Sequence, residues 1–246
     1  MNPRPGTTVQ TDPGLQPCLD DYWTHRAGAY DAGQRRPERW DEDRAMWSRI
    51  WSGALPQPPA QVLDLGTGTG HAALLIAELG HDVIGLDASA GMLAVAEEHA
   101  REARAAGRPT PTFVLGDAVD PDVRAESLDA VTSRYLAWTL RDPVGAMTRW
   151  REALRPGGVL ALVDSTWFTD GLDESPPEFV ASYGAVLDDL PLARATSIVP
   201  TVEAVRAAGF REVAVRELTE VLAADERFGA APGHRPRLQH LVTARR

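Results

Sequence analysis

The sequence has no lysine, so arginine supplies all 25 of its permanently basic side chains. This absence excludes enzymes that form a Schiff base on a lysine amine. It also excludes phosphate-binding loops whose sequence pattern requires a lysine, such as the P-loop. The chemistry of this chain must therefore rest on other residue types.

Cysteine is nearly absent as well, because Cys18 is the only one. A single cysteine excludes an internal disulfide and a cysteine-rich metal site, and it is typical of a chain in a reducing compartment. The histidines show no metal-ligand spacing, so no metal cofactor is expected. The N-terminal segment lacks the apolar core of a signal peptide, and no apolar run reaches about 20 residues, the length of a membrane span. We therefore expect a cytoplasmic protein that does not bind membranes.

Basic charge is scarce relative to acidic charge, since 35 acidic residues against 25 arginines give a net charge of −10. A chain this acidic is repelled by nucleic acids and by anionic membrane surfaces. A small neutral or cationic partner is more compatible with this charge. The sequence leaves open whether the chain is a monomer or a homodimer.

Hydrophobic spacing divides the chain into a helical start and a long alternation of strands and helices. Residues 1–15 are predicted to form a flexible tail, and helices are expected at 16–31 and 38–54. From residue 61 onward, short apolar runs alternate with helical segments, which indicates a parallel sheet with helices on both faces. The strands of this alternation are expected at 61–65, 82–87, 112–117, 128–134 and 159–165.

The remainder of the chain departs from this alternation. Ser175-Pro-Pro-Glu178 is a capping-box pattern, which predicts that a helix begins there in an insert after the fifth strand. A further helix is expected at 201–208, followed by strands at about 211–217 and 238–243 that enclose a polar loop. The predicted sheet thus has seven strands and is mostly parallel. The N-terminal helices and the insert are expected to cover its carboxyl edge, where open α/β sheets bind ligands.

The segment VLDLGTGTG, residues 62–70, places Asp64 directly before a turn with three glycines. A dinucleotide-binding turn has the pattern G-x-G-x-x-G/A and binds a pyrophosphate at the following helix N-terminus. Here the sixth position is His71 instead of glycine or alanine. A carboxylate beside the turn also repels a pyrophosphate but attracts an ammonium or a sulfonium group. The segment therefore favours a cationic ligand without phosphate.

These residues resemble motif I of the class I S-adenosylmethionine-dependent methyltransferases, and the resemblance continues downstream. Asp87 ends the second strand, where the family binds the ribose hydroxyls, and Asp117 ends the third, where the family binds the adenine amino group. Ser133 and Arg134 end the fourth strand, near the methionine portion of the cofactor in relatives. The cofactor-binding residues that the resemblance implies are Tyr30, Asp64, Gly66, Thr67, Gly68, Gly70, Asp87, Ala88, Met92, Asp117, Ala118, Ser133 and Arg134.

The resemblance implies a Rossmann-like α/β fold and a single methyltransferase domain over residues 16–246, and the segment LRPGG before the fifth strand is also typical of it. S-adenosylmethionine is the implied cofactor and S-adenosylhomocysteine the product. The implied acceptor is a small molecule such as a secondary metabolite, as in UbiE-like bacterial members. Within this domain we expect an N-terminal helical cover, a cofactor-binding core, a substrate-cap insert and a C-terminal helix with a strand pair, at 16–56, 57–165, 166–200 and 201–246.

Aromatic side chains are concentrated in the segments expected to cover the site. They can enclose a flat or cationic acceptor, although each is also compatible with packing under the cover. The predicted acceptor-binding residues are Tyr22, Trp23, Tyr135, Trp138, Trp167 and Tyr183. His25 in the first helix is the candidate general base, with Asp164 and Asp170 as weaker candidates. The sequence does not distinguish an oxygen, nitrogen, sulfur or carbon acceptor.

Two other functions compete with methyl transfer to a small molecule. An NAD(P)-dependent oxidoreductase is disfavoured by His71 and by the absence of lysine, which removes a Tyr-x-x-x-Lys pair. A protein that binds the cofactor without consuming its methyl group is also compatible with the motifs. At single positions, Met92 is equally suited to the core and to an adenine contact, and the glycines alone could serve only a tight turn.

Overall fold

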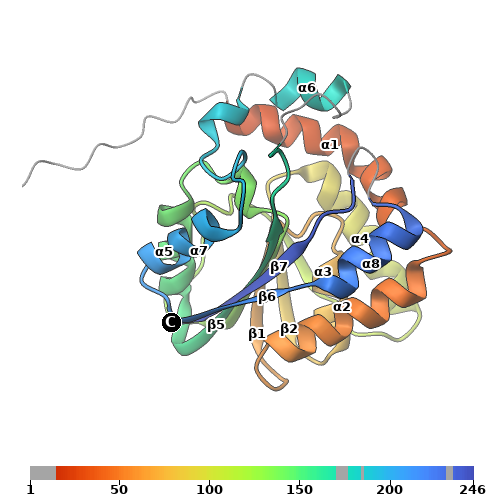
Figure 1. The fold of residues 1–246 in the computed structure, drawn as a ribbon. Helices are drawn as coiled ribbons and strands as arrows, with labels where there is room; N and C mark the ends of the chain where they lie inside the picture. Colours follow the sequence, from red (N-terminus) through yellow and green to blue (C-terminus); the bar gives the residue numbers. More distant parts are fainter. Residues whose placement is uncertain (1–14, 170–176, 184–185, 231–234) are drawn as a thin grey trace, which may run out of the picture.

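The computed structural model describes residues 15–169, 177–183, 186–230 and 235–246. Its centre is a seven-stranded sheet with the strand order β3-β2-β1-β4-β5-β7-β6 (Figure 1). Neighbouring strands from β3 to β5 pair in parallel, and β7 is antiparallel to both of its neighbours. The strands are β1 Gln61–Leu65, β2 Asp82–Asp87, β3 Thr112–Leu115, β4 Leu128–Arg134, β5 Leu154–Ser165, β6 Arg211–Glu217 and β7 Gln239–Arg245. The predicted α/β architecture with a mostly parallel sheet is confirmed.

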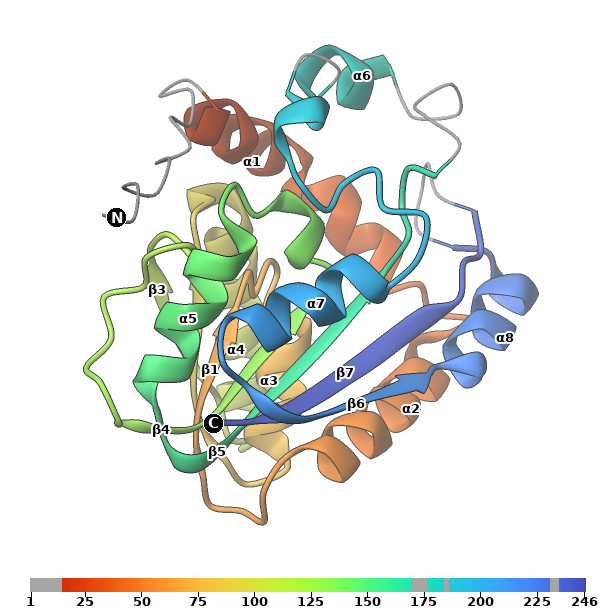
Figure 2. The same ribbon diagram turned by 60° about the vertical axis from the view of Figure 1, so that its left-hand side comes forward.

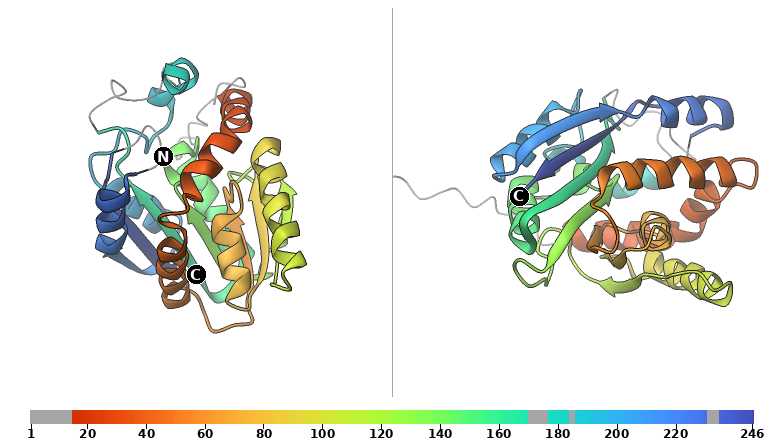
Figure 3. Two further views of the ribbon diagram at one scale, coloured as in Figure 1. Left: turned by 90° about the vertical axis from the view of Figure 1, so that its right-hand side faces the viewer. Right: turned by 90° about the horizontal axis from the view of Figure 1, so that it is seen from below.

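Helices cover both faces of this sheet (Figures 2 and 3). Alternate residues of a strand point to opposite faces, so β1 contributes Leu63 to one apolar core and Val62 to the other. In the first core, Trp150 of α5 packs with the sheet, and α7 lies beside α5 (Figure 2). In the second core, Trp51 of α2 and Ile76 of α3 pack with it. The helices are α1 Leu15–Gln34, α2 Trp40–Ala54, α3 His71–Glu78, α4 Ala90–Ala105, α5 Pro143–Ala153, α6 Pro177–Tyr183, α7 Val199–Ala207 and α8 Thr219–Phe228.

The segment between β6 and β7 corrects one expectation. A polar loop was predicted there, but residues Thr219–Phe228 form α8. Leu218, Val221 and Ala224 are buried in the second core at helical spacing, and this apolar face explains the helix. The glycines and prolines that follow had suggested a loop over the whole segment. The other predicted strands and helices are present among the described residues. β5 begins at Leu154, five residues before its predicted start, so the LRPGG segment expected before the strand belongs to it, and the other ends shift by at most three residues.

A helical roof lies over the carboxyl edge of the sheet. It consists of α1 and α6, which lie side by side above the strands (Figures 1 and 2). The roof has its own aromatic cluster, in which the rings of Phe179 and Tyr183 stack with centroids 4.4 Å apart. Tyr22 of α1 meets the Tyr183 ring edge-on at 5.2 Å. The N-terminal cover and the insert therefore contact each other as well as the sheet.

The roof is joined to the core at the start of α4. The hydroxyls of Thr24 and Ser89 lie 2.9 Å apart and share a hydrogen bond. A Cβ at Gly91 would lie only 2.7 Å from the carbonyl oxygen of Thr24, so α1 and α4 approach as closely as a glycine permits. This contact holds α1 over the ends of β1 and β2.

Part of the predicted architecture lies outside the described residues. This applies to the tail up to residue 14, to the first residues of the capping box at 175–176 and to Asp170. The division of residues 16–246 into four functional parts stays a prediction. No helix among the described residues has the length and apolar character needed to cross a bilayer.

Candidate functional site

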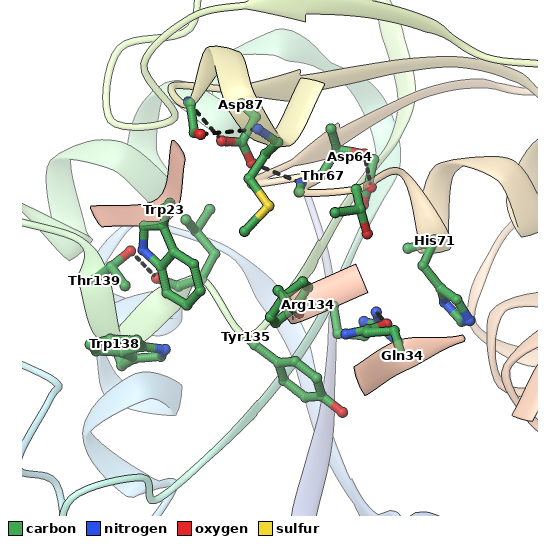
Figure 4. A pocket seen from close by; sticks show the side chains of 18 of the residues that line it. Trp23, Gln34, Asp64, Thr67, His71, Asp87, Arg134, Tyr135, Trp138 and Thr139 are labelled. Atoms are coloured by element: carbon green, nitrogen blue, oxygen red, sulfur yellow. Dashed lines mark hydrogen bonds between the residues drawn. The ribbon is translucent and has the colours of Figure 1, made fainter. Parts of the chain in front are cut away.

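A cavity of about 210 Å³ opens beneath α1, at the carboxyl ends of the parallel strands. It lies where the strand order reverses, because β1 is flanked by β2 on one side and β4 on the other. Figure 4 shows Asp64 and Asp87 at one side of this cavity, with Trp23 and Trp138 facing Gln34 and His71 across it. Among the described residues, no cluster of three or more histidine, cysteine, aspartate or glutamate side chains could hold a metal ion.

The glycine turn between β1 and α3 forms the floor of the cavity. Gly66 and Gly68 have φ angles of 62° and 55°, in the left-handed region that favours glycine. A Cβ at Gly66 would lie 2.8 Å from the Leu136 side chain, so this residue is also required by packing. A Cβ at Gly68 would meet nothing closer than the Tyr30 ring at 4.0 Å. The turn therefore presents open backbone to the cavity at Gly68.

Asp64 stabilises this turn through side-chain hydrogen bonds. The hydroxyls of Thr67 and Thr132 donate hydrogen bonds to its two carboxylate oxygens at 2.7 and 2.8 Å. Burial raises the pKa of Asp64 to about 6, although these two hydrogen bonds oppose the shift. Asp64 lines the cavity as predicted, but its carboxylate already ties the turn to β4. Its direct contact with a cationic ligand stays a prediction.

Asp87 joins the glycine turn to α4. The backbone N–H of Gly68 donates to one of its oxygens at 2.8 Å, and the N–H of Ser89 donates to the other at 2.9 Å. Ser89 in turn caps α4 by accepting the N–H of Met92 at 3.1 Å. Burial raises the pKa of Asp87, while the two backbone donors lower it. Each oxygen retains a lone pair, so Asp87 can accept further hydrogen bonds from a diol in the cavity.

Asp117 is held by a partner that the motif did not indicate. Arg141 donates to one carboxylate oxygen at 2.6 Å, and the N–H of Val119 donates to the other at 2.8 Å. The side chain remains about one-third exposed and lines the cavity together with Ala118. Met92 also lines it while being buried, so it serves the core and the cavity together.

Arg134 is the last residue of β4 and Tyr135 follows it, and both project into the middle of the cavity (Figure 4). The Arg134 guanidinium lies over the rings of Trp47 and Tyr135, at 4.8 and 5.0 Å from their centroids, and donates to Gln34 at 2.6 Å. Tyr135 has a φ of 64°, which is strained for a side chain of this size. Its hydroxyl donates to Gln239 at 2.5 Å, and its N–H donates to Val163. Burial raises the pKa of the Tyr135 hydroxyl, so Tyr135 stays protonated.

A buried ionic cluster, formed by Arg39, Asp43 and Asp225, adjoins Tyr135. Arg39 lies 2.5 Å from an oxygen of Asp43 and 2.6 Å from an oxygen of Asp225. The Gln239 amide donates to the second oxygen of Asp225 at 3.3 Å, which links the cluster to Tyr135. Sequence reasoning missed these residues, because Arg39 and Asp225 are separated by 186 positions and form no motif.

Several predicted site residues lie elsewhere. His25 is exposed, and its ring nitrogen bonds to the carbonyl oxygen of Asp21 in the same helix, at 2.7 Å, so it does not face the cavity as a base would. Tyr22 and Tyr183 are buried in the roof cluster instead of the lining. Ser133 and Gly70 are buried and do not line the cavity. The remaining predicted residues line it, and these are Tyr30, Asp64, Gly66, Thr67, Gly68, Asp87, Ala88, Met92, Asp117, Ala118, Arg134, Trp23, Tyr135, Trp138 and Trp167.

Two of these aromatic residues are positioned from outside the cavity. Trp23 donates from its indole to the Tyr183 hydroxyl at 2.7 Å, so Tyr183 acts behind the lining. The Trp167 indole donates to Asp164 at 2.5 Å, and the same carboxylate accepts the backbone N–H of Trp138 at 3.2 Å. Burial raises the pKa of Asp164 to about 6. Asp164 therefore orients the Trp167 side chain and the backbone at Trp138. Because N–H donors already bond to both of its oxygens, Asp164 is not placed to remove a proton from an acceptor.

Comparisons with known proteins agree with this geometry. Residues 63–162 match the family described as "Methyltransferase domain". Over 185 residues the chain is 32% identical to a demethylmenaquinone methyltransferase of Beutenbergia cavernae, covering 71% of this chain and 70% of that protein. The chain belongs to the class I S-adenosylmethionine-dependent methyltransferases. This confirms the family that the motifs had predicted, and it makes the protein an enzyme whose cofactor is S-adenosylmethionine.

Other methyltransferases are similar over different lengths. Aklanonic acid methyltransferase DauC of Streptomyces sp. strain C5 is 32% identical over 150 residues, covering 59% of this chain and 67% of that protein. The solved Haemonchus contortus phosphoethanolamine N-methyltransferase 2, in complex with S-adenosylhomocysteine, has a TM-score of 0.69 at 22% identity. That similarity covers 94% of this chain and 60% of the other, and it shows the shared fold.

The residues of the cavity fit S-adenosylmethionine. The open backbone at Gly68 leaves room beside the turn. The free lone pairs of Asp87 suit two vicinal ribose hydroxyls, and Asp117 with Ala118 stands at the tip of the third strand for a base edge. The lining around the turn carries carboxylates, which favour a cationic ligand.

Proposed function

We propose that this methyltransferase transfers the methyl group to a small, flat secondary metabolite by in-line displacement. The observation that carries the proposal is the cavity itself, which is roofed by α1 and walled by Trp23, Trp138 and Trp167 at the cofactor-binding edge of the sheet. Aromatic walls of this kind bind planar ring systems through their faces and edges. The ring-bearing acceptors named for the two relatives, demethylmenaquinone and aklanonic acid, support this class of substrate.

When bound, S-adenosylmethionine supplies a methyl carbon attached to a positively charged sulfur. Because a sulfonium would leave as a neutral thioether, the chain does not need to stabilise negative charge on a leaving group. Its residues instead hold the acceptor in line and exclude water, which is where most of the rate gain of such a displacement arises. Trp23, held by Tyr183, and Trp167, held by Asp164, are suited to this orienting role because each indole is fixed by a hydrogen bond.

A cofactor-binding test separates this function from its competitors. Isothermal calorimetry is expected to show S-adenosylhomocysteine binding and no NADH binding. The variant Asp87→Asn should weaken S-adenosylhomocysteine by about tenfold or more, because an amide cannot accept hydrogen bonds at both of its terminal atoms. Asp82→Asn at the other end of β2, where Asp82 is exposed and accepts from the Gln61 amide, is the matched control.

Methyl transfer itself is tested with labelled cofactor. Incubating the protein with methyl-labelled S-adenosylmethionine and a metabolite extract of its native source should move label into a small organic product. Binding of S-adenosylhomocysteine without any transferred label would instead support a protein that uses the cofactor without consuming its methyl group. NADH binding without S-adenosylhomocysteine binding would refute the proposal. The cytoplasmic location and the monomeric or homodimeric state stay predictions.

A further inference from the structure

The arginines in the cavity lining are gathered on one side. Asp20, Asp64, Asp87 and Asp117 line the part next to β1, β2 and β3, and Asp43 and Asp225 line the other side beside Arg39. The arginines of the lining, among the described residues, come from the opposite side, from the α1–α2 connection, the end of β4 and the segment before β7: Arg36, Arg39, Arg134, Arg235 and Arg237. This separation places cationic side chains away from the ribose-binding side, in a protein whose net charge is −10.

Two of these arginines differ from Arg39 in their partners. Arg39 is neutralised by Asp43 and Asp225, as described above. Arg36 donates only to the carbonyl oxygens of Gly33, Phe228 and Gly229, at 3.1, 2.7 and 2.6 Å. Arg134 donates to the Gln34 amide oxygen. Within the part of the chain that the structure describes, neither Arg36 nor Arg134 forms an ion pair with a carboxylate.

The arginines lie close enough together to act on one ligand group. Arg36 and Arg39 both donate to the carbonyl oxygen of Gly229, at 2.6 and 3.1 Å. Arg134 donates to Gln34, the neighbour of the Gly33 whose carbonyl accepts from Arg36. In agreement, Arg39, Arg134 and Arg36 all lower the pKa of Asp43 electrostatically, against the effect of burial. Arg39 and Arg36 also lower the pKa of Asp225 electrostatically, against the effect of burial. The guanidinium groups of Arg36, Arg39 and Arg134 and the carboxylates of Asp43 and Asp225 therefore share one region, in which the guanidinium groups outnumber the carboxylates by one.

The orientation of Arg134 suits a planar anion. Its guanidinium carbon lies over both the Trp47 and the Tyr135 ring, and these rings meet each other edge-on, so they fix the position of the group while its N–H groups form an edge of donors. Such an edge donates two parallel hydrogen bonds to a carboxylate, and these are among the strongest hydrogen bonds in proteins. Tyr135, held in a strained backbone conformation, keeps this arrangement in place.

We propose that the methyl acceptor binds as an oxyanion, with a planar carboxylate held by Arg36 and Arg134. This inference rests on the proposed function and names the class of acceptor. It agrees with the position of His25 outside the cavity, because an acceptor that arrives as an anion does not require a base to remove a proton. When such an oxygen receives the methyl group, a C–O bond forms, the C–S bond breaks and no proton moves.

The test measures charge preference in protein saturated with S-adenosylhomocysteine. S-adenosylhomocysteine carries its own carboxylate, so saturating the protein with it fills the part of the cavity that binds that group. Any remaining preference for a carboxylate over a neutral head group then belongs to the acceptor region. Calorimetric titration compares 2-naphthoate with 2-naphthamide, which has the same ring and a neutral head group. The naphthoate is expected to bind about tenfold more tightly, the gain typical of one charge-assisted contact.

Arginine variants identify the origin of the preference. Arg36→Gln and Arg134→Gln are each expected to reduce the ratio of the two affinities toward one. Because Arg134 is also a predicted cofactor contact, the ratio is measured at S-adenosylhomocysteine concentrations shown by titration to saturate each variant. Arg155→Gln is the matched control, because Arg155 pairs with Asp129 at the opposite edge of the sheet and should leave the ratio unchanged. Reading a ratio instead of an affinity separates loss of charge recognition from a general weakening of the fold.

The outcomes are distinct. If naphthoate has no advantage over naphthamide, including the case in which neither binds, the oxyanion proposal is overturned. It is also overturned if the advantage persists in both arginine variants. Failure of S-adenosylhomocysteine to bind at all would instead refute the proposed function, and that result is read from the first titration.

Discussion

Replacing Gly66 with alanine should destabilise the protein through two separable effects. The φ of 62° costs a residue with a Cβ about 1–2 kcal/mol. The new Cβ would also lie 2.8 Å from the Leu136 side chain, and overpacking of this kind adds about 1–3 kcal/mol. The free energy of unfolding is therefore expected to fall by about 2–5 kcal/mol, measured by urea denaturation.

Gly107→Ala provides the matched control for this prediction. Gly107 has a φ of 72°, and a Cβ there would meet nothing within 4 Å, so only the backbone cost of about 1–2 kcal/mol applies. Combining Gly66→Ala with Leu136→Ala removes the contacts with the Leu136 Cδ atoms, the nearest at 2.8 Å, but keeps the Leu136 Cβ at 3.1 Å, so it should remove part of the steric cost and leave the double variant between Gly66→Ala and the control. If Gly66→Ala is no more destabilising than Gly107→Ala, the reasoning from the close contact is wrong.

Three other substitutions test other parts of the structure. Gly68→Ala should cost only about 1–2 kcal/mol of stability yet weaken S-adenosylhomocysteine binding in calorimetry, because its Cβ would point into open cavity; unchanged affinity would contradict the assignment of the floor. Arg39→Gln leaves two buried aspartates without their partner and should cost about 3–5 kcal/mol in urea denaturation, whereas Arg216→Gln, from an exposed pair, should cost about 0–1 kcal/mol. Asp164 titrates near 3.8 in an unfolded chain and near 6 when folded, so the folded state binds more protons between these pH values and loses stability as the pH rises through them. Asp164→Asn should remove that part of the pH slope, and an unchanged slope in pH-dependent unfolding would contradict the assignment of this titration to Asp164.

The cofactor side of the site could be predicted because it is local in sequence. A glycine turn after one strand and an acid at the end of the next lie within 26 residues of each other, between positions 62 and 87. Parallel strands bring their carboxyl ends to one edge, so the order of the elements is sufficient to place Asp64, Asp87 and Asp117 together. The hydrophobic periods of the strands and helices predicted the sheet for the same reason, because they too are local in the sequence.

The acceptor side could not be predicted in the same way. The pairing of Arg39 with Asp225, and of Tyr135 with Gln239, depends on how α2 and α8 pack against the end of β7, and no local pattern encodes that geometry. His25 was predicted to be the base because its helix covers the site. The sequence did not show that His25 lies on the outer, exposed face of that helix. Tyr22 and Tyr183 were expected in the lining, but their rings complete the roof cluster.

The roof packs through an apolar cluster separate from the two cores, which joins rings of α1 and α6 to Trp138 and Phe168, and it meets α4 at the Thr24–Ser89 hydrogen bond. A group of side chains that is cohesive within itself can separate from the rest of a protein without melting it, as a cooperative unit of lower stability. We therefore expect amide hydrogens of α1 and α6 to exchange with solvent together and before those of the central strands. Such an opening would give a bulky ring system its way in and out.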